Sequence, residues 1–201
     1  MVSGLFGNHA EKFIPVFYHK NGDAWQPWCV ARADFFGSSS TPNLWLDGSV
    51  DAGADYDNWQ DDLLAQAAVP TDVTIDVDVV LAGFDFDVDV TICIEADGIG
   101  KDMRIYVVQV LDHYPAPETY YRNAFRQVIT EDVTIGGGAC VVVQKLRSLK
   151  ATDVAQLQDV GIVAWAQEPV SSGPAEIFQA AYVFPFIMTD GFESGDVMAW
   201  D

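Results

Sequence analysis

VTIDVDV at residues 73–79 and FDFDVDV at residues 84–90 are the two runs of sequence that decide the fold. Apolar residues alternate with polar, mostly acidic ones in both runs, and alternate residues of a β-strand lie on the same face of a sheet. Each run therefore predicts a strand with one apolar and one acidic face. Leu81-Ala82-Gly83 between them predicts a hairpin that keeps the two apolar sets together.

The same period of two continues towards the C-terminus. Further strand-like segments, separated by turns rich in Gly, Pro and Asp, lie at 103–112, 124–135, 139–149, 159–168 and 176–187. Together with 72–80 and 84–95 they give seven strands in about 115 residues, a density typical of an immunoglobulin-like sandwich. We therefore predict an all-β domain over residues 70–188, followed by a short tail over 189–201.

Residues before Val69-Pro70-Thr71 follow the helical period instead. The sequence predicts the end of a helix at 2–13, a buried strand at 13–19, a helix at 28–36, a strand at 41–46 and a helix at 57–68 capped by Asp57. Residues 1–69 are therefore predicted to form a small α/β domain, and the chain as a whole is predicted to be an α+β protein.

The charge of the chain limits its partners. It carries 30 acidic and 10 basic residues, a formal net charge of -20. Such a charge repels nucleic acid and anionic membranes and favours cations or basic partners. It also destabilises the compact state unless salt or divalent ions screen it. We expect no nucleic-acid role, and we expect a saline or calcium-containing exterior; the alternative is an acidic surface that only keeps the protein soluble.

Segments that target a protein to a membrane are not visible in the sequence. No apolar run reaches the roughly 18 residues that a membrane-spanning helix needs, and residues 1–7 lack the basic and apolar regions of a signal peptide. Either the protein is cytoplasmic or the chain is a mature or partial form. We favour the second interpretation, with an extracellular or cell-surface location and attachment to the cell envelope as a possible extension.

Acidic residues form two candidate metal sites. The hairpin register that joins the apolar sets places Asp78 near Asp87 and Asp76 near Asp89, about 5 Å apart, where like charges repel. Calcium, which takes 6 to 8 oxygen ligands, would relieve the repulsion, and so would simple solvation of an exposed face. The second candidate is a Gly-rich loop with four acidic residues, Asp47, Asp51, Asp55 and Asp57.

Three cysteines occur, Cys29, Cys93 and Cys140, without metal-ligand spacing. Cys93 and Cys140 lie in strand-like runs and are either bridged across the sandwich or buried as free thiols. Burial as free thiols is our expectation. A thioredoxin-type reaction needs a low-pKa thiolate at a helix N-terminus and a second cysteine about three residues on, and no C-x-x-C pattern is present.

Several motifs carry a resemblance to known proteins. Thr41-Pro42 entering the short strand that ends at Asp47-Gly48 resembles the strand after the cis-proline of thioredoxin-like domains. The other matching pieces are Tyr18-His19 followed by Gly22-Asp23, Ala31-Arg32 through Phe35-Phe36-Gly37, residues 121–128, residues 162–167, and Gln179-Ala180-Ala181. Their order resembles the outer-membrane-protein-twenty-eight-related family, in which a thioredoxin-like domain precedes an immunoglobulin-like sandwich.

The resemblance implies a partial thioredoxin-like domain without its redox-active cysteine pair, because the segment that carries the pair in the family would precede residue 1. Pro42 is then expected to shape its loop rather than to serve catalysis. No catalytic residue is predicted for the chain as given. An oxidoreductase whose cysteine segment lies upstream remains the competing hypothesis.

The last predicted strand is unusual because residues 180–188 are apolar on both alternating sets, so both faces need cover. A thioredoxin-like domain that lacks a strand would also expose a sheet edge. Strand addition between copies would satisfy both, and such contacts build filaments. The alternative is that this strand packs within its own chain. We predict a secreted, non-enzymatic structural or adhesive protein that self-associates, with a calcium-dependent binding module as a further alternative.

Overall fold

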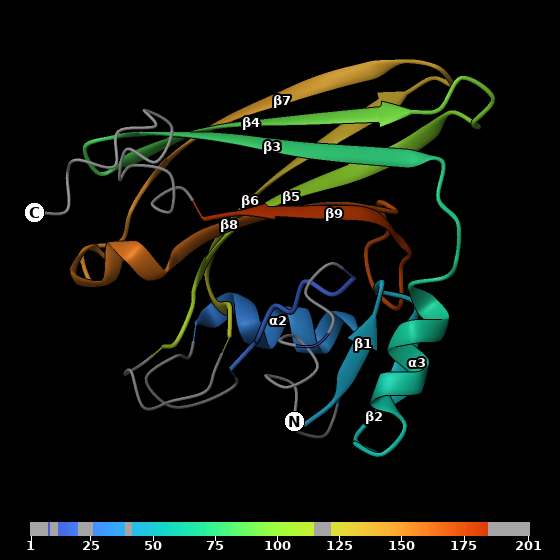
Figure 1. Cartoon of the computed structure of the whole chain (residues 1–201), viewed down its shortest axis with the longest axis horizontal. Helices are drawn as coiled ribbons and strands as arrows, with labels where there is room; N and C mark the ends of the chain where they lie inside the picture. Colours follow the sequence, from blue (N-terminus) through green and yellow to red (C-terminus); the bar gives the residue numbers. More distant parts are fainter. Residues whose placement is uncertain (1–7, 9–11, 20–25, 39–41, 115–121, 185–201) are drawn as a thin grey trace, which may run out of the picture.

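Seven long strands form the second half of the chain, where the sequence alternates with a period of two. The computed structural model describes residues 8, 12–19, 26–38, 42–114 and 122–184, and Figure 1 shows its elements. The strands are β3 (Val73–Ala82), β4 (Asp85–Ile94), β5 (Lys101–Leu111), β6 (Ala124–Ile135), β7 (Cys140–Ser148), β8 (Val160–Gln167) and β9 (Ile177–Val183). Each of the seven predicted strands is present, within a few residues of its expected bounds.

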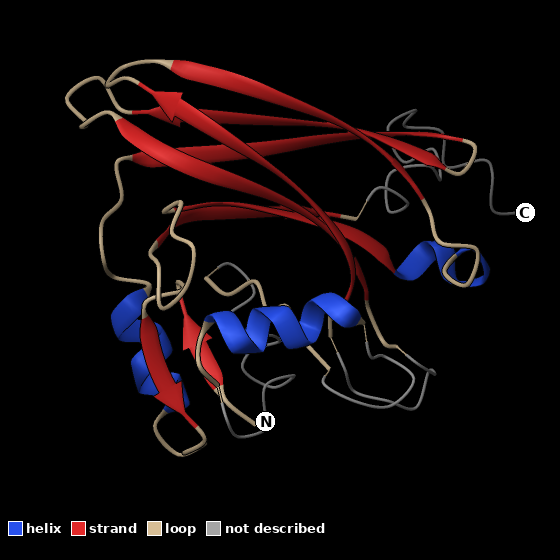
Figure 2. Cartoon of the chain, turned by 180° about the vertical axis from the view of Figure 1, so that it is seen from behind, coloured by secondary structure: helices blue, strands red, loops and turns tan. Residues whose placement is uncertain are grey.

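These strands make two antiparallel sheets that pack face to face. One sheet has the order β3-β4-β7 and the other β6-β5-β8-β9. The apolar sets of both sheets meet in one core that includes Phe86, Ile105 and Ile162, each 0–1% exposed. The chain is therefore rich in β-structure, and its largest unit is a β-sandwich (Figures 1 and 2).

The first hairpin differs from the predicted register. Asp78 lies opposite Asp89 and Asp76 opposite Thr91, a shift of two residues from the predicted pairing. The turn is made by Gly83 and Phe84 rather than by Leu81-Ala82-Gly83, and Gly83 has a φ of 68°, a conformation that glycine adopts without strain. Because the side-chain period is two, this shift keeps the apolar and acidic faces as predicted.

Much of the four-stranded sheet is covered on both faces, although residues 130–132 of β6 are exposed. All of β8 and residues 105–111 of β5 are buried, although only alternate residues can face the other sheet. The second face packs against helix α2 (Pro27–Phe35) and the segment around Ile14–Tyr18, in a cluster with Tyr106, Phe125 and Trp165. Figure 1 shows α2 beneath this sheet, so the chain has three layers where α2 lies.

The N-terminal part confirms some predictions and corrects others. Helix α2, strand β1 (Leu44–Leu46) and helix α3 (Trp59–Gln66) lie where expected. The loop at 47–55 contains an unpredicted strand, β2 (Val50–Gly53), which pairs with β1.

Two local predictions about this part are wrong. The N-cap of α3 is Asn58 rather than Asp57, because Asp55 bonds the Asp57 amide and holds the preceding turn. Residues 13–19 form a single parallel bridge, Phe17 to Ala124, instead of a strand within the β1-β2 sheet.

A 3-10 helix, Val154–Asp159, was also not predicted. Thr41, residues 185–188 of the predicted last strand, the predicted helix at 2–13 apart from Asn8, Lys12 and Phe13, and the tail 189–201 lie outside the described residues.

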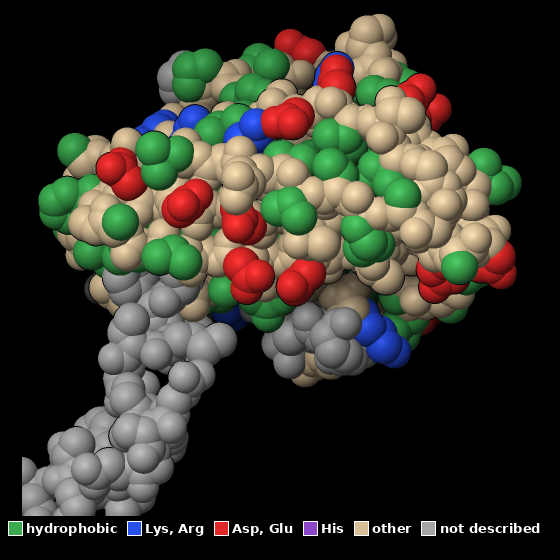
Figure 3. Space-filling view, turned by 90° about the horizontal axis from the view of Figure 1, so that it is seen from above, with side chains coloured by type: hydrophobic (Ala, Val, Ile, Leu, Met, Phe, Trp, Pro, Cys, Tyr) green, Lys and Arg blue, Asp and Glu red, His purple; other side chains and the backbone are tan. Residues whose placement is uncertain are grey.

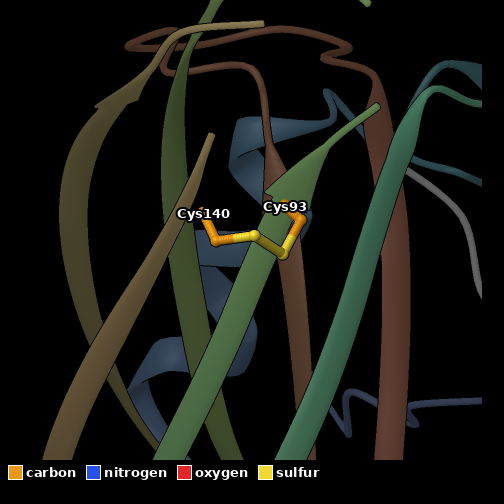
Figure 4. Close-up of a disulfide and its surroundings, with 2 residues drawn as sticks. All are labelled: Cys93 and Cys140. Atoms are coloured by element: carbon orange, nitrogen blue, oxygen red, sulfur yellow. A yellow bond between two sulfur atoms is a disulfide. The ribbon is translucent and has the colours of Figure 1, made fainter. Parts of the chain in front are cut away.

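Cys93 and Cys140 form a disulfide, so the expectation of free thiols is wrong for both. They are direct partners on the neighbouring strands β4 and β7, with Cα atoms 4.1 Å apart (Figure 4). The bridge therefore lies within one sheet and does not cross the sandwich. The adjacent hydrogen bond from the Ile94 amide to the Ala139 carbonyl identifies 93–140 as a non-hydrogen-bonded pair, in which side chains come closest.

Among the residues described, no helix is long and apolar enough to cross a membrane.

Candidate functional site

The outer face of the three-stranded sheet is open to solvent, and we call it the acidic face. It consists of alternate residues of the three strands: Thr74, Asp76, Asp78, Val80 and Ala82 of β3, Asp85, Asp87, Asp89, Thr91 and Cys93 of β4, and Cys140, Val142, Gln144, Leu146 and Ser148 of β7. No Lys, Arg or His belongs to this set. Figure 3 looks down on the face, where acidic side chains lie among hydrophobic ones.

The register determines which candidate metal ligands come together. Asp78 lies opposite Asp89, but Asp87 pairs with Val80 and Asp76 with Thr91. Asp89 also accepts a hydrogen bond from the Gln144 side chain at 3.0 Å. Among the described residues, no group of three or more His, Cys, Asp or Glu side chains could hold a metal ion. The predicted set of four ligands is thus not assembled, and calcium binding stays a hypothesis for solution tests.

Large apolar side chains are exposed on the same face. Val80 is 66% exposed, Leu146 68% and Val142 52%, and Phe84 in the adjoining turn is 58% exposed. Val80 and Leu146 flank Asp87 in one cross-strand row. Single exposed apolar residues are ordinary, but several on one open sheet face mark a candidate binding surface. Sequence reasoning identified the aspartates and missed these apolar neighbours, because Val80, Val142 and Leu146 are ordinary strand residues.

The second acidic cluster serves the local backbone. Asp51 accepts a hydrogen bond from the Gly53 amide at 2.9 Å, and Asp55 accepts bonds from the Asp57 amide and the Asn58 side chain. Burial raises the pKa of the Asp47 carboxyl. The two backbone bonds are those of Asx turns, which gives Asp51 and Asp55 a local role without a ligand.

The turn at Asp47-Gly48 joins the N-terminal part to the sandwich. Both residues have positive φ. The Asp47 carbonyl accepts a hydrogen bond from the amide of Ile177, the first residue of β9, and the Gly48 carbonyl accepts one from the Ala175 amide. A Cβ on Gly48 would lie 2.2 Å from the Ala175 carbonyl oxygen. The turn quoted in the thioredoxin-like resemblance therefore works here as a docking element that only glycine permits.

A buried arginine strengthens this joint. Arg32 of α2 is 4% exposed, and its guanidinium donates to the Gln167 side-chain oxygen at 2.8 Å. Gln167 in turn donates to the carbonyl of Ala175. The guanidinium lies 4.5–5.7 Å from the centres of five aromatic rings, those of Trp28, Phe35, Phe36, Tyr106 and Trp165. Cation-π contacts of this kind compensate a cation that is removed from water. Burial raises the pKa of Tyr18 beside it, an effect that Arg32 opposes.

Comparisons with known proteins show the fold alone. No family model and no curated protein sequence matches the chain. Among solved structures, HBP35 of Porphyromonas gingivalis matches with a TM-score of 0.73 at 12% identity, over 90% of this chain and 67% of that one. A protein from Agrobacterium tumefaciens matches with a TM-score of 0.50 at 18% identity, over 84% of this chain and 75% of that one. The first match includes the N-terminal part as well as the sandwich, because it covers nearly the whole chain.

A second buried arginine, Arg126, lies at a β-bulge in the four-stranded sheet and forms an ion pair. The pairing of β5 with β6 passes from Gln109–Gln127 to Val110–Phe125, so Arg126 has no cross-strand partner. Its guanidinium instead binds Asp153 at 2.7 Å, with both side chains at most 3% exposed. Gln109 donates to the other Asp153 oxygen at 2.8 Å. Sequence reasoning missed this group, although Gln109 and Arg126 are polar residues within apolar strands.

The three cysteines do not form a pair of reactive thiols. Cys29 is fully buried in α2, and burial raises the pKa of its thiol. The other two of the three cysteines are bonded to each other on the far side of the sandwich core. A buried thiol with a raised pKa is unreactive at neutral pH, because the thiolate is the nucleophile.

Proposed function

We propose that the chain is an exported, non-enzymatic protein with a structural or adhesive role at the cell surface or outside the cell. The observation that carries the proposal is the Cys93–Cys140 disulfide, which lies on the open acidic face. Such bonds persist in oxidising compartments and are rare in the cytosol. The net charge of -20 also favours a saline environment outside the cell, because salt screens the repulsion between the charges.

The architecture proposed for this role is a thioredoxin-like remnant docked on an immunoglobulin-like sandwich. The match to HBP35 over 90% of the chain supports this combination. The absence of a reactive thiol pair supports a role without redox catalysis. An upstream segment carrying C-x-x-C would revive the oxidoreductase alternative, and intact-mass analysis of the native protein tests for it.

A more specific version of the proposal is self-assembly by strand addition. Of the two edge strands of the three-stranded sheet, β3 is better suited to pair with another strand. β3 is ten residues long, pairs with β4 without a bulge, and contains no Pro or Lys. The opposite edge, β7, directs Lys145 and Arg147 to the inner face, a feature that protects edges from pairing. β9 up to Val183 packs within its own chain, so this part of the predicted donor strand is already occupied.

Proline substitutions at the two edges test the assembly. The hydrogen bond from the Glu95 amide to the Asp72 carbonyl makes Val73–Ile94 a non-hydrogen-bonded pair. Because the two kinds of pair alternate along the strands, Val79–Val88 is of the same kind, and the Val79 amide points away from β4. On β7, the Val142 amide points away from β4 in the same way. Val79→Pro therefore removes a free edge donor of β3, and Val142→Pro is the matched control.

We expect light scattering and electron microscopy to show assembly of the wild type and of Val142→Pro, but not of Val79→Pro. Each sample is measured with and without calcium. A wild-type protein that stays monomeric at high concentration in both conditions would exclude assembly. Disulfide mapping of protein purified from its natural source tests export separately, since reduced Cys93 and Cys140 would contradict it.

A further inference from the structure

We propose that the acidic face, with its exposed apolar residues, is a docking surface for a basic polypeptide segment whose cationic and apolar side chains are interspersed. This inference rests on the proposed adhesive function and names the chemical class of its partner. It uses the open face of the three-stranded sheet, not the β3 edge.

The side chains on the face are arranged in a pattern that such a segment would match. Asp85, Asp87 and Asp89 run along the central strand β4, while Val80 lies on one side and Leu146 and Val142 on the other. A partner that fits places cations over the centre and apolar groups over both margins. Interfaces of this kind combine desolvated apolar anchors with complementary charge.

Negative charges on the face repel one another. Asp78 and Asp89 are direct cross-strand partners, and like charges in that position destabilise a sheet. The Cys93–Cys140 disulfide joins β4 to β7 and so does not bridge the β3–β4 pair that carries this repulsion. Cationic side chains of a partner would replace this repulsion by attraction, so binding and stability are linked.

A second copy of the chain does not fit as the occupant of this face. The chain has only 10 basic residues. Two of them, Arg32 and Arg126, are buried. Four more already form ion pairs with acidic residues of their own chain: Lys101, Arg104, Arg122 and Lys145. A second copy would meet aspartates with few available cations, so charge complementarity requires a different, basic molecule.

Peptide binding tests the proposal. The probe is a synthetic peptide in which lysine alternates with leucine, and binding is measured by calorimetry at low and high salt. Peptides with lysine alternating with serine, and glutamate alternating with leucine, are the matched controls for the apolar and charged parts. We expect the lysine–leucine peptide to bind tightest and to keep part of its affinity at high salt, because salt screens only the charges.

Two pairs of protein variants locate the site. Val80→Ser with Leu146→Ser removes apolar residues from both margins, and Asp78→Asn with Asp87→Asn removes two negative charges, one on β3 and one on the central strand β4. We expect each pair to weaken the lysine–leucine peptide about tenfold, as loss of interface anchors does. The matched controls change the same residue types elsewhere on the surface: Val69→Ser with Ile99→Ser, and Asp57→Asn with Asp61→Asn. We expect less than about a twofold effect from these.

Equal weakening by the surface controls would overturn the proposal, since the attraction would then be the diffuse charge of the whole chain. No effect of the Val80 and Leu146 pair would also overturn it. Self-association that is lost in the face variants would identify a second copy as the occupant instead. Far-UV circular dichroism and melting curves check that every variant folds. A failure of peptide binding leaves the disulfide mapping and the assembly test unaffected, so it is distinguishable from a failure of the proposed function.

Discussion

The two sheets of the sandwich differ in how many of their faces are covered. Most of the four-stranded sheet is buried on both sides, by the three-stranded sheet and by the N-terminal part, whereas the three-stranded sheet has one open face. Their sequences differ accordingly, because β8 reads VGIVAWAQ and is buried throughout, while β3 and β4 alternate strictly. The comparison teaches that the N-terminal part stabilises one sheet by covering it and leaves the other available for contacts.

The largest expected effect on stability comes from a comparison of residues on the outer faces of the two sheets. Phe125 on the covered sheet is 1% exposed and stacks on Trp28 with ring centres 4.8 Å apart. We expect Phe125→Ala to lower the free energy of unfolding by about 4 kcal/mol, as loss of a buried ring does. Leu146→Ala on the open sheet should change it by less than about 0.5 kcal/mol. Urea unfolding measures both, and similar losses would contradict the asymmetry.

The disulfide gives the next largest effect. Cys93 and Cys140 are 47 residues apart in sequence, so their bond restricts the unfolded chain. Replacing both by Ser should cost about 3 kcal/mol. The same loss should follow reduction of the wild type, and the doubly substituted protein should not respond to reductant. A wild type whose melting temperature is insensitive to reductant would show that the open sheet does not depend on the bond.

Two glycines with the same backbone conformation separate the docked turn from the free turn. Gly48 and Gly83 both have a φ of 68°, so alanine at either position costs about 1 kcal/mol of backbone strain. Only at Gly48 would the new Cβ meet other atoms, since nothing lies within 4 Å of a Cβ on Gly83. We expect Gly48→Ala to cost about 2 kcal/mol more than Gly83→Ala. Equal losses would show that the turn at Gly48 is not docked on β9.

The strands could be predicted from the sequence because the period of two is a local property. The faces of β3 and β4 were predicted correctly even though their register was wrong, since a shift by two residues preserves them. The disulfide was missed because whether two distant cysteines come into register depends on the pairing of β4 with β7, which the local pattern does not encode.

The contacts between the N-terminal part and the sandwich could not be predicted either. Arg32 and Gln167 are 135 residues apart, and each alone looks like an ordinary polar residue of a helix or a strand. The strand predicted at 13–19 instead makes one bridge to the start of β6, so tertiary contacts override its apolar pattern. The acidic residues of the candidate face were visible in the sequence, whereas the opposition of Asp78 and Asp89 required the observed register.

The smallest effect concerns the charge at the docked turn. Burial raises the folded-state pKa of Asp47 above its unfolded value, so its ionised form disfavours folding at neutral pH. Asp47→Asn removes that charge and suits a positive φ, as Asn-Gly turns do. The Asp47 side chain keeps much of its contact with solvent, so the gain in the free energy of unfolding at pH 7 should be only about 0.5 kcal/mol.

The sign of this effect can be followed by titration. As the pH falls from the folded to the unfolded pKa of Asp47, the wild type binds a proton preferentially in the folded state and recovers stability. The advantage of Asp47→Asn should therefore shrink as the pH falls through this window. Asp57→Asn, at an exposed position, is the control, and its effect should not show the same pH dependence. If the advantage of Asp47→Asn is the same at acidic and neutral pH, the benefit comes from the turn conformation alone and the docked turn carries no charge penalty.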